Sequence, residues 1–193
     1  MEQEELNGVL RRHEAWLKGK LYGERADLGG ADLHHARLQG TDLQHAILEH
    51  SDLRSADLQH AILEHSDLRH SDLRGTDLRN AILEDSYLEG AILRGADLRY
   101  SDLRGAGLRH SDLRGADIDY ASWPLGCGSL KAYVDDRIAI QLLYHTLSVV
   151  QHSPYVSEDV KAKLLTPEIV SLANRFHRVL EGGEIKEWEE GTK

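Results

Sequence analysis

The chain has 193 residues, a formal net charge of −10 and a pI of about 5.6. Binding to nucleic acid or to an anionic membrane surface needs a basic patch, so this balance argues against both. No stretch has the length of a membrane span, and the N-terminal residues lack the apolar run of a secretory signal. The single cysteine, Cys127, excludes an internal disulfide. We therefore expect a soluble, cytoplasmic protein.

The first predicted element is an amphipathic helix over about residues 3–21. Its apolar side would hold Leu6, Val9, Leu10, Trp16, Leu17 and Leu21. It precedes a repeat array, and the open end of such an array exposes apolar interior and unpaired backbone. We expect residues 1–25 to cap that end.

From Ala26 to Ala121 the sequence repeats every five residues. A leucine, or an isoleucine in the last repeat, recurs nineteen times without a slip, from Leu28 to Ile118. Two positions earlier stands only Ala, Ser or Thr, and the position between them is usually Asp. A period of five fits neither a helix, with 3.6 residues per turn, nor a strand, with its alternation of two. It is satisfied when each repeat forms one side of a square coil, with the large and the small residue pointing inward.

The consensus [AST]-D-L-x-x resembles the pentapeptide-repeat proteins over about half of the chain. The resemblance implies a mainly β fold, a right-handed quadrilateral β-helix with four repeats per coil, so residues 26–121 would make nearly five coils. Asp is replaced at seven outward positions, by Arg37, Ile47, Ile62, Ile82, Tyr87, Ile92 and Gly107. Segments 43–54 and 58–69 are the same twelve letters, LQHAILEHSDLR. Either a recent tandem duplication or an engineered array explains that identity.

Residues 122–193 are predicted to form a C-terminal helical region with a frayed tail. Trp123 falls at the next leucine position, where it would plug the last coil. Helices are expected over about 130–151, with Ser129 as a possible N-cap, after Ser157 through Leu165, and from Thr166-Pro167-Glu168 with Ile169, Leu172, Phe176 and Leu180 on the apolar side. The resemblance implies that such helices cap the coil or form a dimer interface. Both remain open, so the chain is a monomer or a homodimer.

The sequence contains no glycine-rich phosphate loop, nucleophile motif or metal-ligand spacing. We therefore predict no catalytic, cofactor-binding or metal-binding residues, and no enzyme. Residues twenty apart would stack, placing His45 beside His65 and His50 beside His70. A metal bridge between stacked imidazoles is the less favoured interpretation, because a solvated histidine ladder explains the same pattern.

The outward charges differ between the four sides of the predicted coil. One side carries Arg54, Arg74, Arg94 and Arg114 against four aspartates, and its net charge is zero. Another side nets −4, because only Arg104 opposes its five acids, and it also carries two stacked isoleucines. This second side is the candidate interaction surface, made of Asp42, Ile62, Glu64, Ile82, Glu84, Asp85 and Asp102. Ordinary solubilising charge is the competing explanation.

The predicted function is that of a non-enzymatic interaction or scaffold protein with an unidentified protein partner. The family resemblance implies an alternative, a DNA mimic that binds a type II topoisomerase such as gyrase and inhibits it or protects it from quinolones. The coil nets −8 from 18 acids and 10 arginines, and the arginine rows break up the uniform potential that mimicry requires. An engineered repeat scaffold is the third possibility.

Overall fold

The computed structural model describes residues 1–122, 132–153 and 156–174. The chain forms two compact units, Met1–Val134 and Asp135–Lys193, which are described separately. The first contains helix α1 (Gln3–Leu17) and the repeats. The second contains α2 (Asp136–His152), α3 (Glu158–Leu164) and α4 (Pro167–Ala173).

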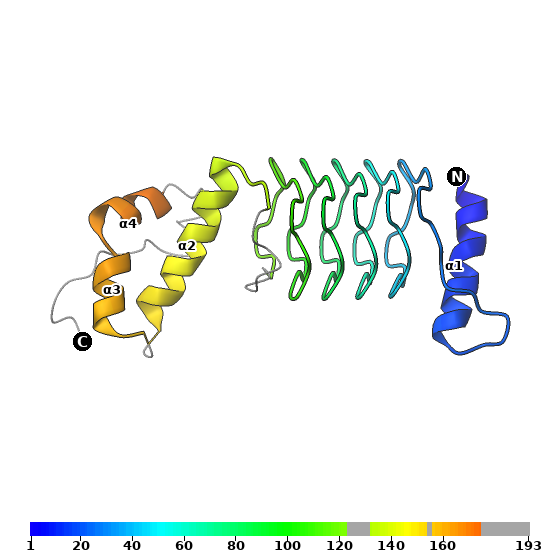
Figure 1. Cartoon of the computed structure of the whole chain (residues 1–193), viewed down its shortest axis with the longest axis horizontal. Coiled ribbons are helices and arrows are strands. Elements are labelled where there is room, and N and C mark those ends of the chain that lie inside the picture. Colours follow the sequence, from blue (N-terminus) through cyan, green and yellow to red (C-terminus); the bar gives the residue numbers. More distant parts are fainter. Residues whose placement is uncertain (123–131, 154–155, 175–193) are drawn as a thin grey trace. The chain divides into compact units, whose positions relative to one another are not determined.

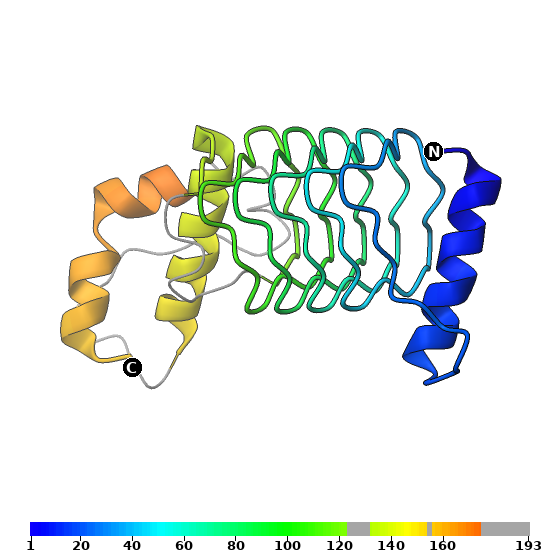
Figure 2. The same ribbon diagram turned by 45° about the vertical axis from the view of Figure 1, so that its right-hand side comes forward.

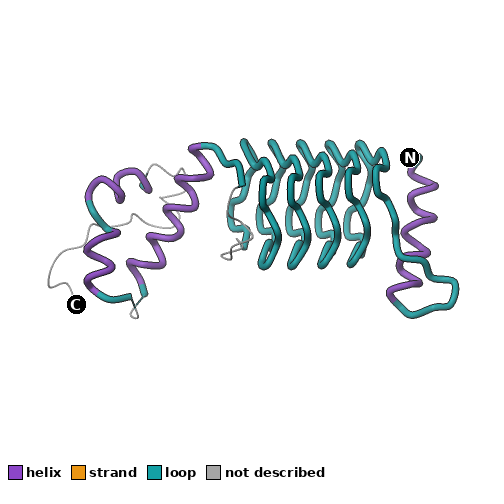
Figure 3. Tube along the Cα trace, in the orientation of Figure 1, coloured by secondary structure: helices purple, strands orange, loops and turns teal. Residues whose placement is uncertain are grey.

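The repeats form a solenoid in which residues twenty apart pair. The middle residue of each repeat makes a parallel bridge to its equivalent twenty residues on, from Asp27–Ile47 through to Asp102–Ser122, so four repeats complete one coil (Figure 1). Within the described residues every bridge is isolated, because turns follow each bridged position; Figure 3 accordingly shows the coil as loop. The chain is therefore a repeat solenoid of the β-helix kind without extended strands in its described part.

The interior of the solenoid is a ladder of leucines beside a ladder of small residues. All nineteen large positions from Leu28 to Ile118 are buried. Each such side chain contributes roughly 1.5–3 kcal/mol when removed from water. Six of the small residues are buried serines, and each hydroxyl donates to the carbonyl three residues earlier, as Ser51 does to Leu48 at 2.7 Å. This bond satisfies the buried hydroxyl and explains why Ser alternates freely with Ala.

Every repeat ends in a tight turn whose last residue adopts the left-handed conformation. The turn closes with a hydrogen bond from the next repeat, such as Ala56 N–H to the Leu53 carbonyl at 3.0 Å. Among the nineteen fifth positions, seven are glycine and twelve are other residues, with φ between 54° and 74° throughout. A positive φ at this one position is typical of a type II turn, where glycine is the ordinary choice. Non-glycine residues there carry strain of about 1–2 kcal/mol each.

Helix α1 closes the N-terminal end of the solenoid by hydrogen bonding to the first coil (Figure 2). The Gln3 side chain accepts from the Arg37 N–H at 2.9 Å and donates to its carbonyl at 3.2 Å, so it imitates a neighbouring strand. The buried His13 accepts the Ala26 N–H through Nδ1 at 3.0 Å. The prediction for Leu21 is wrong: the helix ends at Leu17, and Leu21 lies fully exposed in the turn that follows.

At the other end, the solenoid continues beyond the last repeat. Ser122 bridges to Asp102, and Tyr133 bridges to Asp112 with its N–H on the Ser111 carbonyl at 2.8 Å. The predicted helix start near residue 130 is therefore wrong. Helix α2 begins at Asp136, and Asp135, not Ser129, accepts the Ile138 N–H at 3.0 Å as its cap. Trp123, the predicted plug, and Ser129 lie outside the described residues.

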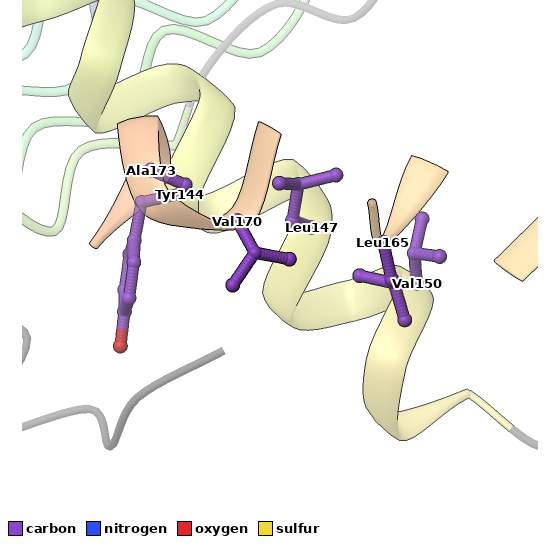
Figure 4. Close-up of a cluster of buried hydrophobic side chains, with 6 residues drawn as sticks. All are labelled: Tyr144, Leu147, Val150, Leu165, Val170 and Ala173. Atoms are coloured by element: carbon purple, nitrogen blue, oxygen red, sulfur yellow. The ribbon is translucent and has the colours of Figure 1, made fainter. Parts of the chain in front are cut away.

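The second unit packs its helices around a small apolar cluster. Tyr144, Leu147 and Val150 of α2 meet Leu165, Val170 and Ala173, all nine-tenths or more buried (Figure 4). Ser157 caps α3 by accepting the Val160 N–H at 3.4 Å, as its position predicts. Thr166 precedes α4, which begins at Pro167, but it makes no side-chain cap bond. Leu172 does not belong to the buried side, since 40% of it is exposed; Phe176 and Leu180 lie outside the described residues.

Candidate interaction face

One side of the solenoid, which we call the acidic face, consists of residues 41–45, 61–65, 81–85 and 101–105. Its central column is formed by successive parallel bridges that join Asp42 to Ile62, Ile62 to Ile82, and Ile82 to Asp102. Both isoleucines are half-buried on the outer surface of the coil. The structure thus places two aliphatic side chains on adjacent rungs, with a carboxylate on the rung before and on the rung after.

The turn beside this column carries the remaining candidate residues. Glu64 and Glu84 stand on adjacent rungs at the first turn position, and Asp85 occupies the left-handed position with φ 54°. The Asp85 carboxylate lies directly over Gly105 on the next coil, where any Cβ would come within 2.0 Å of its Oδ1. All seven predicted surface residues therefore share one face.

Arg104 partly offsets the negative charge at one end of the acidic face. Its guanidinium contacts Asp102 at 2.6 Å and Glu84 at 2.8 Å. The hydrogen bond from Arg104 holds the pKa of Asp102 below its ordinary value, against the opposing effect of burial. No ion pair within 4 Å involves Asp42, Glu64 or Asp85 in the described part of the chain. Three of the four uncompensated negative charges of the face therefore lie with these carboxylates, and the fourth remains with Glu84 and Asp102, which share one arginine.

The aspartates at the middle position of the repeat have a local structural role that an isoleucine at the same position cannot fill. In all twelve repeats with Asp at the middle position, its Oδ1 accepts the backbone N–H two residues on, at 3.1–3.3 Å. This arrangement is an Asx turn, and it orders the turn that follows. Ile62 and Ile82 have no such acceptor. They are the only adjacent pair of aliphatic replacements in any column, since the neighbours of Ile47 and of Ile92 are aspartates.

The side made of residues 31–35, 51–55, 71–75, 91–95 and 111–115, which we call the neutral face, is built differently. Arg54 pairs with Asp52, and Arg74 pairs with Asp72 at 2.6 Å. Hydrogen bonds from Arg54 lower the pKa of Asp52 to about 2. Arg94 follows Ile92, so it lacks a partner in its own repeat and instead reaches Asp112 on the next coil at 2.5 Å. Asp112 is also contacted by Arg114 at 2.6 Å, and no ion pair within 4 Å involves Asp32 among the described residues. This side is therefore neutral in its total charge, without one-to-one pairing.

The predicted histidine stacks are present. The rings of His45 and His65 are 5.1 Å apart and inclined by 8°, and those of His50 and His70 are 5.1 Å apart and inclined by 12°. No group of three or more potential metal ligands occurs within residues 1–122, 132–153 and 156–174. An unpredicted stack joins Tyr100 and Tyr120 at 5.0 Å. Tyr100 and Tyr120 are twenty residues apart at the last position of their repeats, so the same spacing that predicted the histidine stacks also identifies this one from the sequence.

Two functional contributions of side chains escaped the sequence reasoning. The Asx role of aspartate was not predicted, although its recurrence at the middle position of twelve of the nineteen repeats was a signal. The anchoring of Ala26 by His13 and of Arg37 by Gln3 left no signal, because the partners are 13 and 34 residues apart without a repeat to relate them. In the described part of the chain, no helix is both long and apolar enough to span a membrane.

These stacked four-repeat coils with a leucine interior define the chain as a repeat solenoid. A profile described as pentapeptide repeats matches eight copies over residues 24–54, 51–90 and 81–119. The chain belongs to the pentapeptide-repeat family. No curated protein sequence matches it.

Several solved pentapeptide-repeat structures are similar. The protein alr5209 from Nostoc PCC 7120 is 30% identical over 66% of this chain and 95% of its own, with a TM-score of 0.33. HetL from Nostoc sp. strain PCC 7120, involved in heterocyst differentiation regulation, is 30% identical over 57% of this chain and 60% of its own, with a TM-score of 0.28. The plasmid-mediated fluoroquinolone resistance protein QnrB1 is 19% identical over 65% of this chain and 70% of its own, with a TM-score of 0.25.

Proposed function

We propose that the chain is a non-enzymatic interaction protein whose acidic face binds a partner protein. The observation that carries this proposal is the Ile62–Ile82 pair. Each isoleucine gives up an Asx hydrogen bond that twelve other repeats make, and the two lie on adjacent rungs of one column. An interaction surface accounts for apolar side chains placed together where the repeat otherwise uses aspartate.

Charge supports the same face. The neutral face carries four arginines for its four aspartates, whereas the acidic face carries one arginine for five acids. Asp42, Glu64 and Asp85 of the acidic face have no ion pair within 4 Å among the described residues. Uncompensated charges around an apolar centre resemble the polar rim and apolar core of protein interfaces. The solenoid would serve as a rigid support, with the right-handed sense that its family resemblance implies. Direct nucleic-acid binding does not fit a coil of net charge −8.

The test compares two double variants, one in each of the two identical segments 43–54 and 58–69. Ile62→Thr with Glu64→Gln alters the acidic face, and Ile47→Thr with Glu49→Gln alters the same letters of the twelve-residue duplicate on another side. Each purified protein is immobilised and exposed to a lysate of the organism that encodes it. A partner should be captured saturably by the wild type and by the second variant, but not by the first. Equal capture by all three proteins would refute the acidic face as the site.

Binding to a type II topoisomerase is the alternative partner class. The net charge of the coil favours it, but seven Asp–Arg pairs within single repeats interrupt the acidic surface that a mimic of duplex DNA needs. A gyrase supercoiling assay, with and without a quinolone, separates the two. Inhibition or protection at micromolar protein would replace the general proposal with this one. Sedimentation of the purified chain would decide between the monomer and a homodimer through the C-terminal helices.

A further inference from the structure

We infer that the partner segment recognised by the acidic face is a basic amphipathic α-helix lying along the solenoid axis. The inference rests on the proposed function and adds the kind of partner. It follows from the spacing of the groups on the face, together with their chemistry.

The rungs of the solenoid set a fixed repeat along its axis. Stacked rings on adjacent coils are 5.0–5.1 Å apart, and bridged strands in general lie about 4.8 Å apart. The column Asp42–Ile62–Ile82–Asp102 therefore presents acid, apolar, apolar and acid over three such steps. Any extended partner that engages the whole column needs an outward repeat close to this value.

A helix has that repeat and a strand does not. One helical turn rises about 5.4 Å, so three turns drift from three rungs by about 2 Å. Alternate side chains of a strand are about 6.7 Å apart, so three repeats drift by about 6 Å, which is more than one rung. A strand running across the face would meet only one rung. Over the whole column from Asp42 to Asp102, only a helix keeps a stripe of side chains at three- and four-residue spacing in step with the rungs.

The chemistry of the face selects a cationic helix. Asp42, Glu64 and Asp85 are the carboxylates without an ion pair, and they flank the isoleucines. Lys or Arg beside an apolar stripe at three- and four-residue spacing would match both features. Arg104 contacts both Glu84 and Asp102, which leaves one net negative charge at that end of the face, so basic residues of the partner gain less there.

The experiment measures binding of a defined probe to the purified full chain. The probe is a fluorescent Ala-based peptide of about 20 residues, long enough to hold a helix, with Leu at i, i+4 and i+7 and Lys flanking them. A second peptide of equal composition alternates Leu and Lys with period two, and a third replaces Lys by Glu. Fluorescence anisotropy should show saturable binding of the first peptide alone, weakened by salt.

The matched variants make the site assignment falsifiable without loss of folding. Ile62→Thr should weaken binding roughly tenfold and Glu64→Gln several-fold, whereas Ile47→Thr and Glu49→Gln should leave it unchanged. Equal binding of the period-two peptide, or equal weakening by the Ile47 and Ile62 variants, would overturn the inference. If no helix binds while lysate capture still depends on Ile62 and Glu64, the helical partner is refuted and the proposed function stands.

Discussion

Shortening Leu73 tests the leucine ladder on which the rest of the structure depends. Leu73 is fully buried in the middle of the solenoid, where the ladder hydrogen bonds of its own and the next coil fix the surrounding backbone. Its N–H bonds to the Ile92 carbonyl at 2.8 Å, so the coils cannot easily move together to fill a void. Leu73→Ala should therefore lower the free energy of unfolding by about 3–5 kcal/mol, in the upper part of the range for buried leucines replaced by alanine.

Arg74 provides the matched surface control one residue away. Its guanidinium contacts Asp72 at 2.6 Å, but its side chain is 50% exposed, and exposed ion pairs contribute about 0–1 kcal/mol. Arg74→Ala should change the free energy of unfolding by less than about 1 kcal/mol. Leu73→Asp, which buries an unpaired carboxylate in the same place, should abolish folding.

The measurement is urea denaturation followed by far-ultraviolet circular dichroism, with the wild type and all three variants at one protein concentration. Because repeat arrays can lose cooperativity, the midpoint and the slope of each transition are compared as well as the extrapolated free energy. Similar transitions for Leu73→Ala and Arg74→Ala would mean that Leu73 is not packed. That result would refute the assignment of the five-residue period to an inward-facing ladder.

Three further predictions concern turns and the N-terminal cap. Asp57→Ala should lose about 1 kcal/mol of stability while Asp57→Asn, which keeps an acceptor for Gln59 N–H, should lose little; equal losses would contradict the Asx role. Ser55→Gly relieves about 1–2 kcal/mol of left-handed strain against roughly 0.4–1 kcal/mol of added unfolded-state entropy, so the melting temperature should rise, and a fall would count against strain at φ 55°. Burial, the largest effect, lowers the pKa of His13, whose neutral ring accepts the Ala26 N–H. The unfolded chain therefore takes up the proton first, and this contribution to stability is complete above about pH 6.5 and lost as the pH falls below it. His13→Gln should flatten that part of the stability–pH curve, and an unchanged curve would exclude His13 as its source.

The five-residue period was enough to predict the interior, because inward and outward positions differ in size and polarity at every repeat. It was not enough to predict the turns. Propensity assigns left-handed positions to glycine and asparagine, yet His45, Ser55 and Tyr100 adopt φ of 55–62° here. Ladder hydrogen bonds on both sides impose that conformation, and this tertiary constraint overrides the local preference of each residue.

The sequence predicted which residues share the candidate face, but it did not predict which of their charges form ion pairs. Counting by twenty residues placed Asp42, Ile62, Ile82 and Asp102 in one column, because the coil contains neither an insertion nor a deletion. The double contact of Arg104 with Glu84 and Asp102 depends on side-chain conformation across coils, which no spacing rule supplies. Helix ends were less predictable for a related reason, since Tyr133 rejoins the coil one residue out of the repeat phase.

The internal duplication shows why a local motif does not reveal the function of such a chain. Segments 43–54 and 58–69 have the same letters but are offset by fifteen residues, three sides of a four-sided coil. Ile47 therefore bridges Asp27 and Asp67, whereas Ile62 bridges Asp42 and Ile82. Removing fifteen residues would keep the inward pattern intact and still move every later side chain to a different face, while removing twenty would preserve every face. Folding depends on where a residue lies in its five-residue repeat, because that place decides whether the side chain points inward. Recognition depends on where a residue lies in the twenty-residue coil, because that place decides which face carries the side chain. The residues that select a partner are therefore found by comparing positions twenty apart.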